Sequence, residues 1–234
     1  MNGEELLLAD KWTVRYVATL PREHPELYDP ARPELALPHT VETAWSPRHQ
    51  AIEWTLPPGA DRVYLPLATE AGEVRLTVGA KVWSVGADGV VELDSLPSPA
   101  RQAWLVLRAA PPNRAVLTGP VTYRFEEGFL AAGSWFEQGL RSYVGAVRMR
   151  QTFRWDDEPS PSAVLDLGRV EAASVEARLN GKPLGRRAGE SFHFDLAAEL
   201  RRGDNEIELL VRNTPGRDCG VFGPVRIFSL PDSP

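Results

Sequence analysis

Short runs in which apolar and polar residues alternate recur along the chain, with glycine, proline, asparagine and aspartate between them. Alternation with period two is typical of a β-strand with one buried face, because successive side chains point to opposite sides. Strands that recur roughly every 8–12 residues are typical of sandwiches and barrels. The clearest runs are residues 73–78, 103–109, 163–168, 174–179, 191–196 and 206–213. The pattern predicts an all-β fold.

Helical periodicity is nearly absent from the sequence. The segment "LAAELRRG" predicts one helical turn over 196–203, capped by Asp195 and ended by Gly203. Asn180-Gly181 predicts a type I′ hairpin turn, because both central residues of that turn need a positive φ. A second tight turn is predicted at 203–205, where the sequence is Gly-Asp-Asn.

Five segments recur in the same order in the two halves of the chain. "EVRLTVGAK" at 73–81 matches "SVEARLNGK" at 174–182 with an offset of 101. The other matches are 65–67 with 165–167, 90–93 with 192–196, 104–109 with 208–213, and 119–125 with 223–229, the last two with an offset of 104. Chance similarity between alternating strands is the alternative explanation. The shared order favours duplication, and it predicts two tandem β-sandwiches, one over 1–128 and one over 129–234.

The second half carries a more specific set of motifs. These are "YVGAVRMRQTF", "VLDLG", a strand closed by "NGK", "FHFDL", the turn "RGDN" and a strand ending in "VRN", in that order over 143–230. The set resembles the sugar-binding jelly-roll domain of glycoside hydrolase family 2. It is also similar to the C-terminal sandwiches of family 106 rhamnosidases, which share the galactose-binding-domain-like fold. The first copy departs from the pattern, since Gly79-Ala80 stands where Asn-Gly is expected, so we interpret it as a diverged sandwich.

The resemblance implies a carbohydrate-binding or accessory module, because the catalytic residues of these hydrolases lie on a separate barrel. A TIM barrel alone needs about 250 residues, and this chain of 234 residues shows no series of βα units. The expected partners are a carbohydrate and either a glycoside hydrolase catalytic domain or a second copy of the chain. No cofactor is expected, although a structural calcium ion is common in such sandwiches. The identity of the sugar stays open.

Composition narrows the function classes further. A net charge of −6, with the basic residues scattered singly, argues against a non-specific nucleic-acid surface. Cys219 is the only cysteine, so the chain can form neither an internal disulfide nor a cysteine zinc cluster. The N-terminal residues read as neither a signal peptide nor a membrane span. As written, the protein is expected in the cytoplasm, or outside the cell if a signal peptide has been removed.

Candidate sugar-binding residues lie in two segments of the second half, 133–143 and 213–220, and at Arg212 at the end of the strand before the second segment. Carbohydrate sites combine aromatic faces with planar amide, acid and guanidinium groups, and such groups gather in loops at one end of a sandwich. The candidates are Trp135, Glu137, Gln138, Tyr143, Arg212, Asn213, Arg217 and Asp218. The alternative is that these residues have structural roles, with the aromatic rings covering a junction and Asn213 capping a strand end. The insert "EQGLRSYVG" at 137–145 is the shortest segment that we expect to contain the sugar-binding site.

Other residues that could carry catalysis or bind a metal are better explained by structural roles. Glu137 and Asp157 are the carboxylates nearest the aromatic cluster, but their spacing does not pair them as a glycosidase requires. His193 and Asp195 lie two apart in a strand, which is too few ligands for a metal site. Cys219 is expected to be a small buried residue. The tryptophans predicted to be core residues are Trp12, Trp54, Trp104 and Trp155.

Three hypotheses follow for the function. The first is a non-catalytic carbohydrate-binding or accessory module related to glycoside hydrolases. The second is a structural or interaction protein that mediates subunit assembly. The third is a small glycoside hydrolase, in which Glu137 would carry the chemistry; we expect no catalysis on this chain.

Overall fold

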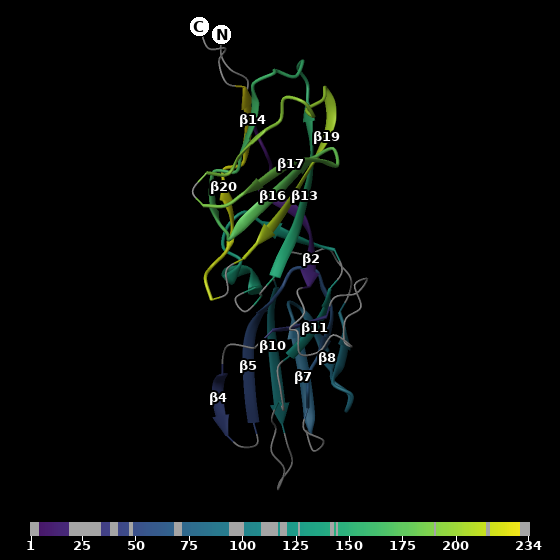
Figure 1. Cartoon of the computed structure of the whole chain (residues 1–234). Helices are drawn as coiled ribbons and strands as arrows, with labels where there is room; N and C mark the ends of the chain where they lie inside the picture. The colour runs from purple at the N-terminus through teal and green to yellow at the C-terminus, as the bar shows by residue number, and fades with distance from the viewer. Residues whose placement is uncertain are drawn as a thin grey trace. The chain divides into compact units, whose positions relative to one another are not determined.

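The computed structural model is built almost entirely of antiparallel β-strands (Figure 1). It describes residues 5–18, 34–37, 42–46, 49–67, 72–93, 101–108, 117, 121–125, 127–140, 143, 145–189, 191–213 and 216–229. The prediction of an all-β fold is confirmed. The two runs predicted at 73–78 and 174–179 are strands with those limits. His24 and His39 lie outside the described residues.

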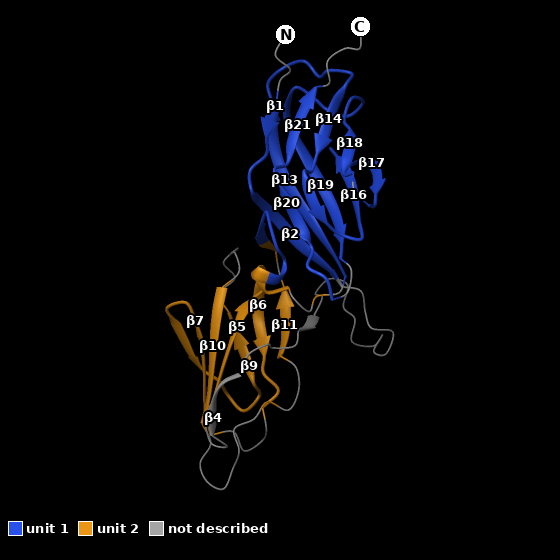
Figure 2. Ribbon diagram, turned by 90° about the vertical axis from the view of Figure 1, so that its left-hand side faces the viewer, with its two compact units in different colours: residues 1–19, 129–136, 144–234 blue, residues 20–128, 137–143 orange. Residues whose placement is uncertain are grey.

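The chain divides into two compact units (Figure 2). Unit 1 comprises Met1–Thr19, Phe129–Phe136 and Val144–Pro234, and unit 2 comprises Leu20–Gly128 and Glu137–Tyr143. Among the described residues the one helical element is η2 (Phe136–Leu140), a short turn with non-helical backbone angles at Gln138 and Gly139, at the point where the chain passes from one unit to the other.

Unit 1 is a sandwich of a six-stranded and a four-stranded sheet. The six-stranded sheet has the order β12-β2-β13-β19-β16-β17. Its strands are β12 (Gly128–Ala131), β2 (Lys11–Ala18), β13 (Gly145–Trp155), β19 (Gly203–Arg212), β16 (Ser174–Leu179) and β17 (Lys182–Arg187). The four-stranded sheet has the order β1 (Glu5–Leu7), β21 (Arg226–Ser229), β14 (Ala163–Asp166) and β18 (His193–Asp195). A separate pair joins β15 (Arg169–Glu171) to β20 (Gly220–Gly223).

Unit 2 is a sandwich of a five-stranded and a four-stranded sheet. The five-stranded sheet contains β4 (Glu42–Ser46), β5 (His49–Leu56), β10 (Arg101–Arg108), β7 (Glu73–Val78) and β8 (Lys81–Ser84), in that order. The four-stranded sheet contains β3 (Glu34–Leu37), β11 (Val121–Phe125), β6 (Ala60–Tyr64) and β9 (Val90–Glu92).

The N-terminal segment belongs to the sandwich formed by the C-terminal half. β2 pairs with β13, from Ala18 opposite Gly145 to Thr13 opposite Arg150, and β1 pairs with β21. Residues 5–18 therefore complete both sheets of unit 1, and the chain of unit 2 is inserted between β2 and β13. The units thus differ from the predicted division at residue 128, because the edges of β13 and β21 are closed by strands from the other end of the chain.

The two units have the same strand order. β4-β5-β10-β7-β8 in unit 2 corresponds to β2-β13-β19-β16-β17 in unit 1, and β3-β11-β6-β9 corresponds to β1-β21-β14-β18. The pairing register corresponds as well, since Glu73 lies opposite Arg108 in unit 2 and Ser174 opposite Arg212 in unit 1. These positions are related by offsets of 101 and 104, the values that relate the matching sequence segments.

One predicted match is shifted by two residues in the structure. Leu65 N donates to Gly89 O at 2.9 Å, and Leu167 N donates to Phe192 O at 3.3 Å. Leu65 therefore takes the position of Leu167, an offset of 102 rather than the 100 that the letters "LPL" and "LDL" indicate. Trp45 lies opposite Gln50 as Tyr16 lies opposite Val147, so Trp45 corresponds in register to Tyr16.

The predicted turns are mostly present. Asn180 and Gly181 have φ of 51° and 80° and join β16 to β17, as a type I′ turn requires. Asp195 Oδ1 accepts from Ala197 N at 2.9 Å, which caps the single turn after β18. The predicted turn at 203–205 is instead the start of β19, where Asn205 is buried and its side-chain amide donates to the carbonyls of Arg201 and Gly203.

Candidate functional site

The two aromatic rings in the predicted sugar site are core side chains. Trp135 is 1% exposed and Tyr143 is 2% exposed. Trp135 is held in unit 1 by a hydrogen bond from its backbone N to Cys219 O at 2.8 Å, and Tyr143 N donates to Leu140 O at 3.0 Å. A buried ring has no face on which a pyranose can stack, so neither residue acts as a sugar platform in this structure.

The polar candidates in unit 1 mostly hold the backbone. Asn213 Oδ1 accepts from Gly145 N at 2.9 Å, and Asn213 N donates to Gly145 O at 3.2 Å, so this side chain caps the start of β13. Asp218 Oδ1 accepts from Phe136 N at 3.2 Å and from Cys219 N at 2.8 Å. These contacts favour a structural role for both side chains.

The remaining candidates are divided between the units. Arg212 Nε lies 3.7 Å from Glu176 Oε1 on the outer face of the six-stranded sheet, and Arg217 is exposed. Glu137 and Gln138 belong to unit 2 with Tyr143. A Cβ on Gly139 would lie 2.5 Å from Thr55 O, so the turn that carries Glu137 and Gln138 packs closely against the end of β5. The eight predicted residues therefore do not form one cluster within either unit.

His193 and Cys219 have structural surroundings. His193 Nε2 lies 3.2 Å from Asp166 Oδ1 rather than beside Asp195, whose carboxylate caps a turn. Cys219 is buried, and this burial raises the pKa of its thiol to about 12, so the thiolate needed for nucleophilic chemistry does not form near neutral pH. The prediction that Cys219 is a buried residue is confirmed.

The described part of the chain holds neither a metal-binding cluster nor a membrane-spanning helix. Within those residues there is no group of three or more histidine, cysteine, aspartate or glutamate side chains able to hold a metal ion. The described residues also contain no helix with the length and hydropathy of a membrane span.

A different surface has the features of a binding site. Trp104, in the middle of β10, is 43% exposed, so its predicted core position is wrong, whereas Trp12, Trp54 and Trp155 are buried as predicted. The inward positions of β10 are Ala103, Leu105 and Leu107, and side chains alternate across a strand, so Trp104 must point to the other side.

The outward side chains around Trp104 form what we call the Trp104 face. Its members are Gln102, Trp104 and Val106 of β10, Ala51, Glu53 and Thr55 of β5, Arg75 and Thr77 of β7, and Val82 of β8. Trp104 lies directly opposite Glu53 on one side and Thr77 on the other. Side chains opposite each other in antiparallel strands have Cβ atoms about 5 Å apart, so the indole is flanked by a carboxylate and a hydroxyl.

Polar groups on this face remain open to a ligand. Gln102 Nε2 donates to Thr55 Oγ1 at 3.3 Å, which orients that amide and leaves its carbonyl oxygen as an acceptor. Arg75 forms an ion pair with Glu73. The carboxylate of Glu53 makes no hydrogen bond or ion pair with another described residue. The Trp104 face thus presents an aromatic ring, an acceptor carboxylate, an amide and a hydroxyl on one face of the five-stranded sheet.

The sequence contained one indication of this surface. At the offset of 104, Trp104 corresponds to Glu208, whose side chain lies on the outer face of the six-stranded sheet. A tryptophan at a position that is polar in the matching segment indicates an outward ring. Read by itself, "AWLVLR" has apolar residues on both faces, which is why the core was predicted there.

Comparison with known proteins found only distant similarity. No family model matches the chain, and no curated protein matches it. Among solved structures, the chain is similar to a rhamnosidase from Novosphingobium sp. PP1Y, at 17% identity and a TM-score of 0.39, over 86% of this chain and 25% of that one. It is also similar to a β-D-glucuronidase of Dictyoglomus thermophilum, at 16% identity and a TM-score of 0.36, over 76% of this chain and 30% of that one.

A third solved structure is the β-glucuronidase of Bifidobacterium dentium, at 16% identity and a TM-score of 0.37, over 75% of this chain and 31% of that one. The chain spans a quarter to a third of the length of these proteins. At TM-scores below 0.5, these likenesses carry no argument about the activity of the chain.

Proposed function

We propose that this protein is a non-catalytic carbohydrate-binding module of the kind that accompanies glycoside hydrolases, and that the Trp104 face holds the sugar. One observation carries the proposal: a tryptophan ring stands exposed on the central strand of a five-stranded sheet, directly opposite an acceptor carboxylate. The galactose-binding-like character of the sandwiches, and their origin by duplication, belong to the same proposal. The shared strand order and register of the two units support it.

The chemistry of the face suits a neutral sugar. One face of a pyranose consists of C–H groups, which pack against an indole, while its hydroxyls lie around the rim and seek hydrogen-bond partners. Glu53 accepts such bonds, Gln102 accepts through its carbonyl oxygen, and Thr77 can do both.

The arrangement supports binding rather than hydrolysis. Glycosidases of both stereochemical classes use two carboxyl groups, about 5–10 Å apart, that flank the scissile bond. Glu53 is the only carboxylate among the residues that define the Trp104 face, and Glu73 at the end of β7 is ion-paired with Arg75 and Arg108. A second carboxylate able to act as a proton donor is therefore missing from this set.

The test is affinity electrophoresis followed by calorimetry against a panel of neutral plant and bacterial polysaccharides. Wild type is expected to bind at least one of them, and Trp104→Ala is expected to abolish that binding. Tyr64→Ala is the matched control, because Tyr64 is 45% exposed on the other sheet of the same unit. The proposal would be contradicted if the folded wild-type protein bound no glycan, or if the two variants lost glycan affinity equally.

Assembly is the second candidate, and the same face supplies its basis. Val82 is 60% exposed and lies opposite Thr77, which places an apolar side chain one strand further from Trp104. Large exposed apolar side chains near one another are typical of a protein interface, and here Thr77 separates Val82 from Trp104. Light scattering after size exclusion separates the two functions: a dimer that Trp104→Ala converts to a monomer supports assembly, whereas a wild-type monomer with glycan affinity supports the binding module.

A further inference from the structure

The outer face of the six-stranded sheet of unit 1 concentrates positive charge. Eight charged residues at outward positions of five adjacent strands are six arginines and two glutamates, an excess of four positive charges on a protein whose net charge is −6. We call this surface the arginine face. It comprises Arg15, Arg148, Arg150, Arg178, Arg186, Arg212, Glu176 and Glu208.

The register brings like charges together on this face. Arg148 lies directly opposite Arg15 on β2, and Arg150 is the next outward residue of β13. Like charges directly opposite each other destabilise a sheet. The Nε of Arg148 is also buried and makes no hydrogen bond to a described residue.

The two glutamates neutralise only part of the cluster. Glu208 lies 2.8 Å from Arg150 Nε and 3.6 Å from Arg148 Nε, so one carboxylate serves two guanidinium groups. Glu176 lies 3.7 Å from Arg212 Nε. Arg178 and Arg186 are exposed, and neither guanidinium group has an ion-pair partner among the described residues.

We propose that the arginine face binds an anionic polysaccharide whose sugars carry carboxylate groups. A guanidinium group offers a planar pair of N–H donors that matches a carboxylate in bidentate geometry. In the row that contains Arg150, Glu208 and Arg178, the two arginines lie two strands apart, which is roughly 10 Å. This surface is separate from the Trp104 face, and the proposal does not depend on that face.

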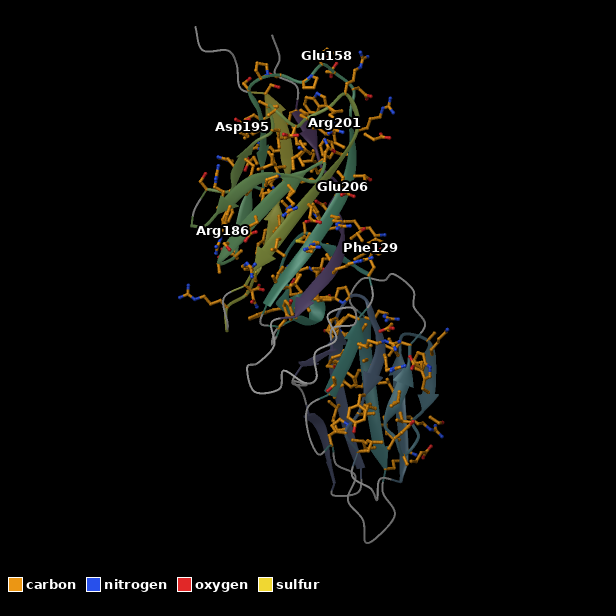
Figure 3. All side chains as sticks on the ribbon, turned by 45° about the vertical axis from the view of Figure 1, so that its right-hand side comes forward. Phe129, Glu158, Arg186, Asp195, Arg201 and Glu206 are labelled. Carbon is orange, nitrogen blue, oxygen red and sulfur yellow. The ribbon has the colours of Figure 1, made fainter. Side chains whose placement is uncertain are left out.

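Nucleic acid fits the arginine face less well. Single-stranded nucleic acid is held by aromatic platforms as well as positive charge, and none of the eight residues of the arginine face is aromatic. Phe129, on the neighbouring strand β12, already has Lys11 Nζ 3.8 Å from the centre of its ring. Figure 3 shows Phe129 and Arg186 at separate places on unit 1.

The test is to measure the binding of sodium polygalacturonate by calorimetry at low ionic strength. The fully methyl-esterified form of the same polymer is the uncharged control ligand. The wild type is expected to bind the acid form and not the ester. Arg178→Gln with Arg186→Gln should weaken binding roughly tenfold, as expected for the loss of one or two charge-assisted hydrogen bonds. Lysine at both positions should leave an intermediate affinity, because it keeps the positive charge but lacks the planar pair of N–H donors of a guanidinium group.

The matched control is Arg201→Gln with Arg202→Gln, which removes the same charge from an exposed pair elsewhere on the unit (Figure 3 labels Arg201). This variant is expected to bind within about twofold of wild type. Equal losses in the two double variants would overturn the proposal, as would binding of the methyl ester. Tighter binding of dextran sulfate or of oligothymidylate would also overturn it. Trp104→Ala is expected to leave polygalacturonate affinity unchanged, so failure of one surface is distinguishable from failure of the other.

Discussion

Trp104 on β10 lies directly opposite Glu53 on β5, and the indole is exposed while the carboxylate has no partner among the described residues. If both groups contact one sugar, each contributes separately to affinity. Glu53→Ala should weaken glycan binding by roughly fivefold, which corresponds to the loss of about one hydrogen bond. Glu53→Gln should weaken it less, since an amide oxygen still accepts.

Calorimetry with the best glycan from the panel checks this prediction. Glu206→Ala serves as the control, because it removes the same charge from an exposed position of unit 1 (labelled in Figure 3). Unchanged affinity in Glu53→Ala would remove this residue from the binding surface.

The second prediction concerns Trp135, which was expected to bind sugar and is instead buried. Trp135→Ala should lower the free energy of unfolding by about 3–5 kcal/mol, because it leaves a large cavity. Glycan affinity measured on the folded fraction should not change. A variant with wild-type stability and lost affinity would restore Trp135 to the binding site.

Asp166 should make the stability of unit 1 depend on acid pH. Burial raises the pKa of this carboxyl, but hydrogen bonds from Gly168 N and Arg226 Nε and the charges of His193 and Arg226 outweigh that effect, so the pKa lies below its usual range. Because the folded pKa is depressed, the stabilisation is present above the unfolded pKa of about 3.9. It is lost as the pH falls through the folded value.

Asp166→Asn should therefore reduce the free energy of unfolding by about 1–3 kcal/mol at pH 7, and the difference from wild type should shrink at lower pH. Urea unfolding at pH 7 and pH 3 measures it. Asp156→Asn, on an exposed residue, should change stability by less than about 0.5 kcal/mol at both pH values. A constant deficit for Asp166→Asn at both values would contradict the charge-based explanation.

Alanine substitutions at two glycines of unit 2 distinguish the cost of a steric clash from the cost of backbone strain. Both have a positive φ, 69° at Gly89 and 58° at Gly79. A Cβ at Gly89 would lie 2.0 Å from Leu65 O, whereas a Cβ at Gly79 would meet nothing within 4 Å. Gly79→Ala should cost about 1–2 kcal/mol, and Gly89→Ala should cost several kcal/mol more or prevent folding. Thermal unfolding followed by circular dichroism compares them; equal costs would contradict the close approach.

The contribution of the N-terminal segment to unit 1 is testable with fragments. Residues 129–234 alone leave β13 and β21 without their partners β2 and β1, so this fragment should be unfolded or should aggregate. Residues 1–19 joined to 129–234 by a short flexible linker should restore the sheets and fold. Dispersion in proton–nitrogen correlation spectra reports the result, and a folded 129–234 fragment would contradict the inserted arrangement.

Much of the fold was predictable because strand patterns are local. The runs at 73–78 and 174–179 are strands with the predicted limits, and the offsets of 101 and 104 also relate the paired positions of the two units. The candidate site was predicted poorly. Trp135 and Tyr143 were chosen for residue type and turned out to be buried, whereas Trp104 was assigned to the core and is exposed.

The sequence by itself determined the all-β class, the Asn180-Gly181 hairpin and the positions of most strands, because alternation and turn residues act between near neighbours. Only the tertiary structure decided which face of β10 is buried and where residues 1–19 pair. A strand such as "AWLVLR" is apolar on both faces, so the packing of a second sheet decides which face is buried. A strand acquires its partner only by pairing over a long stretch of chain, and local patterns do not carry that information.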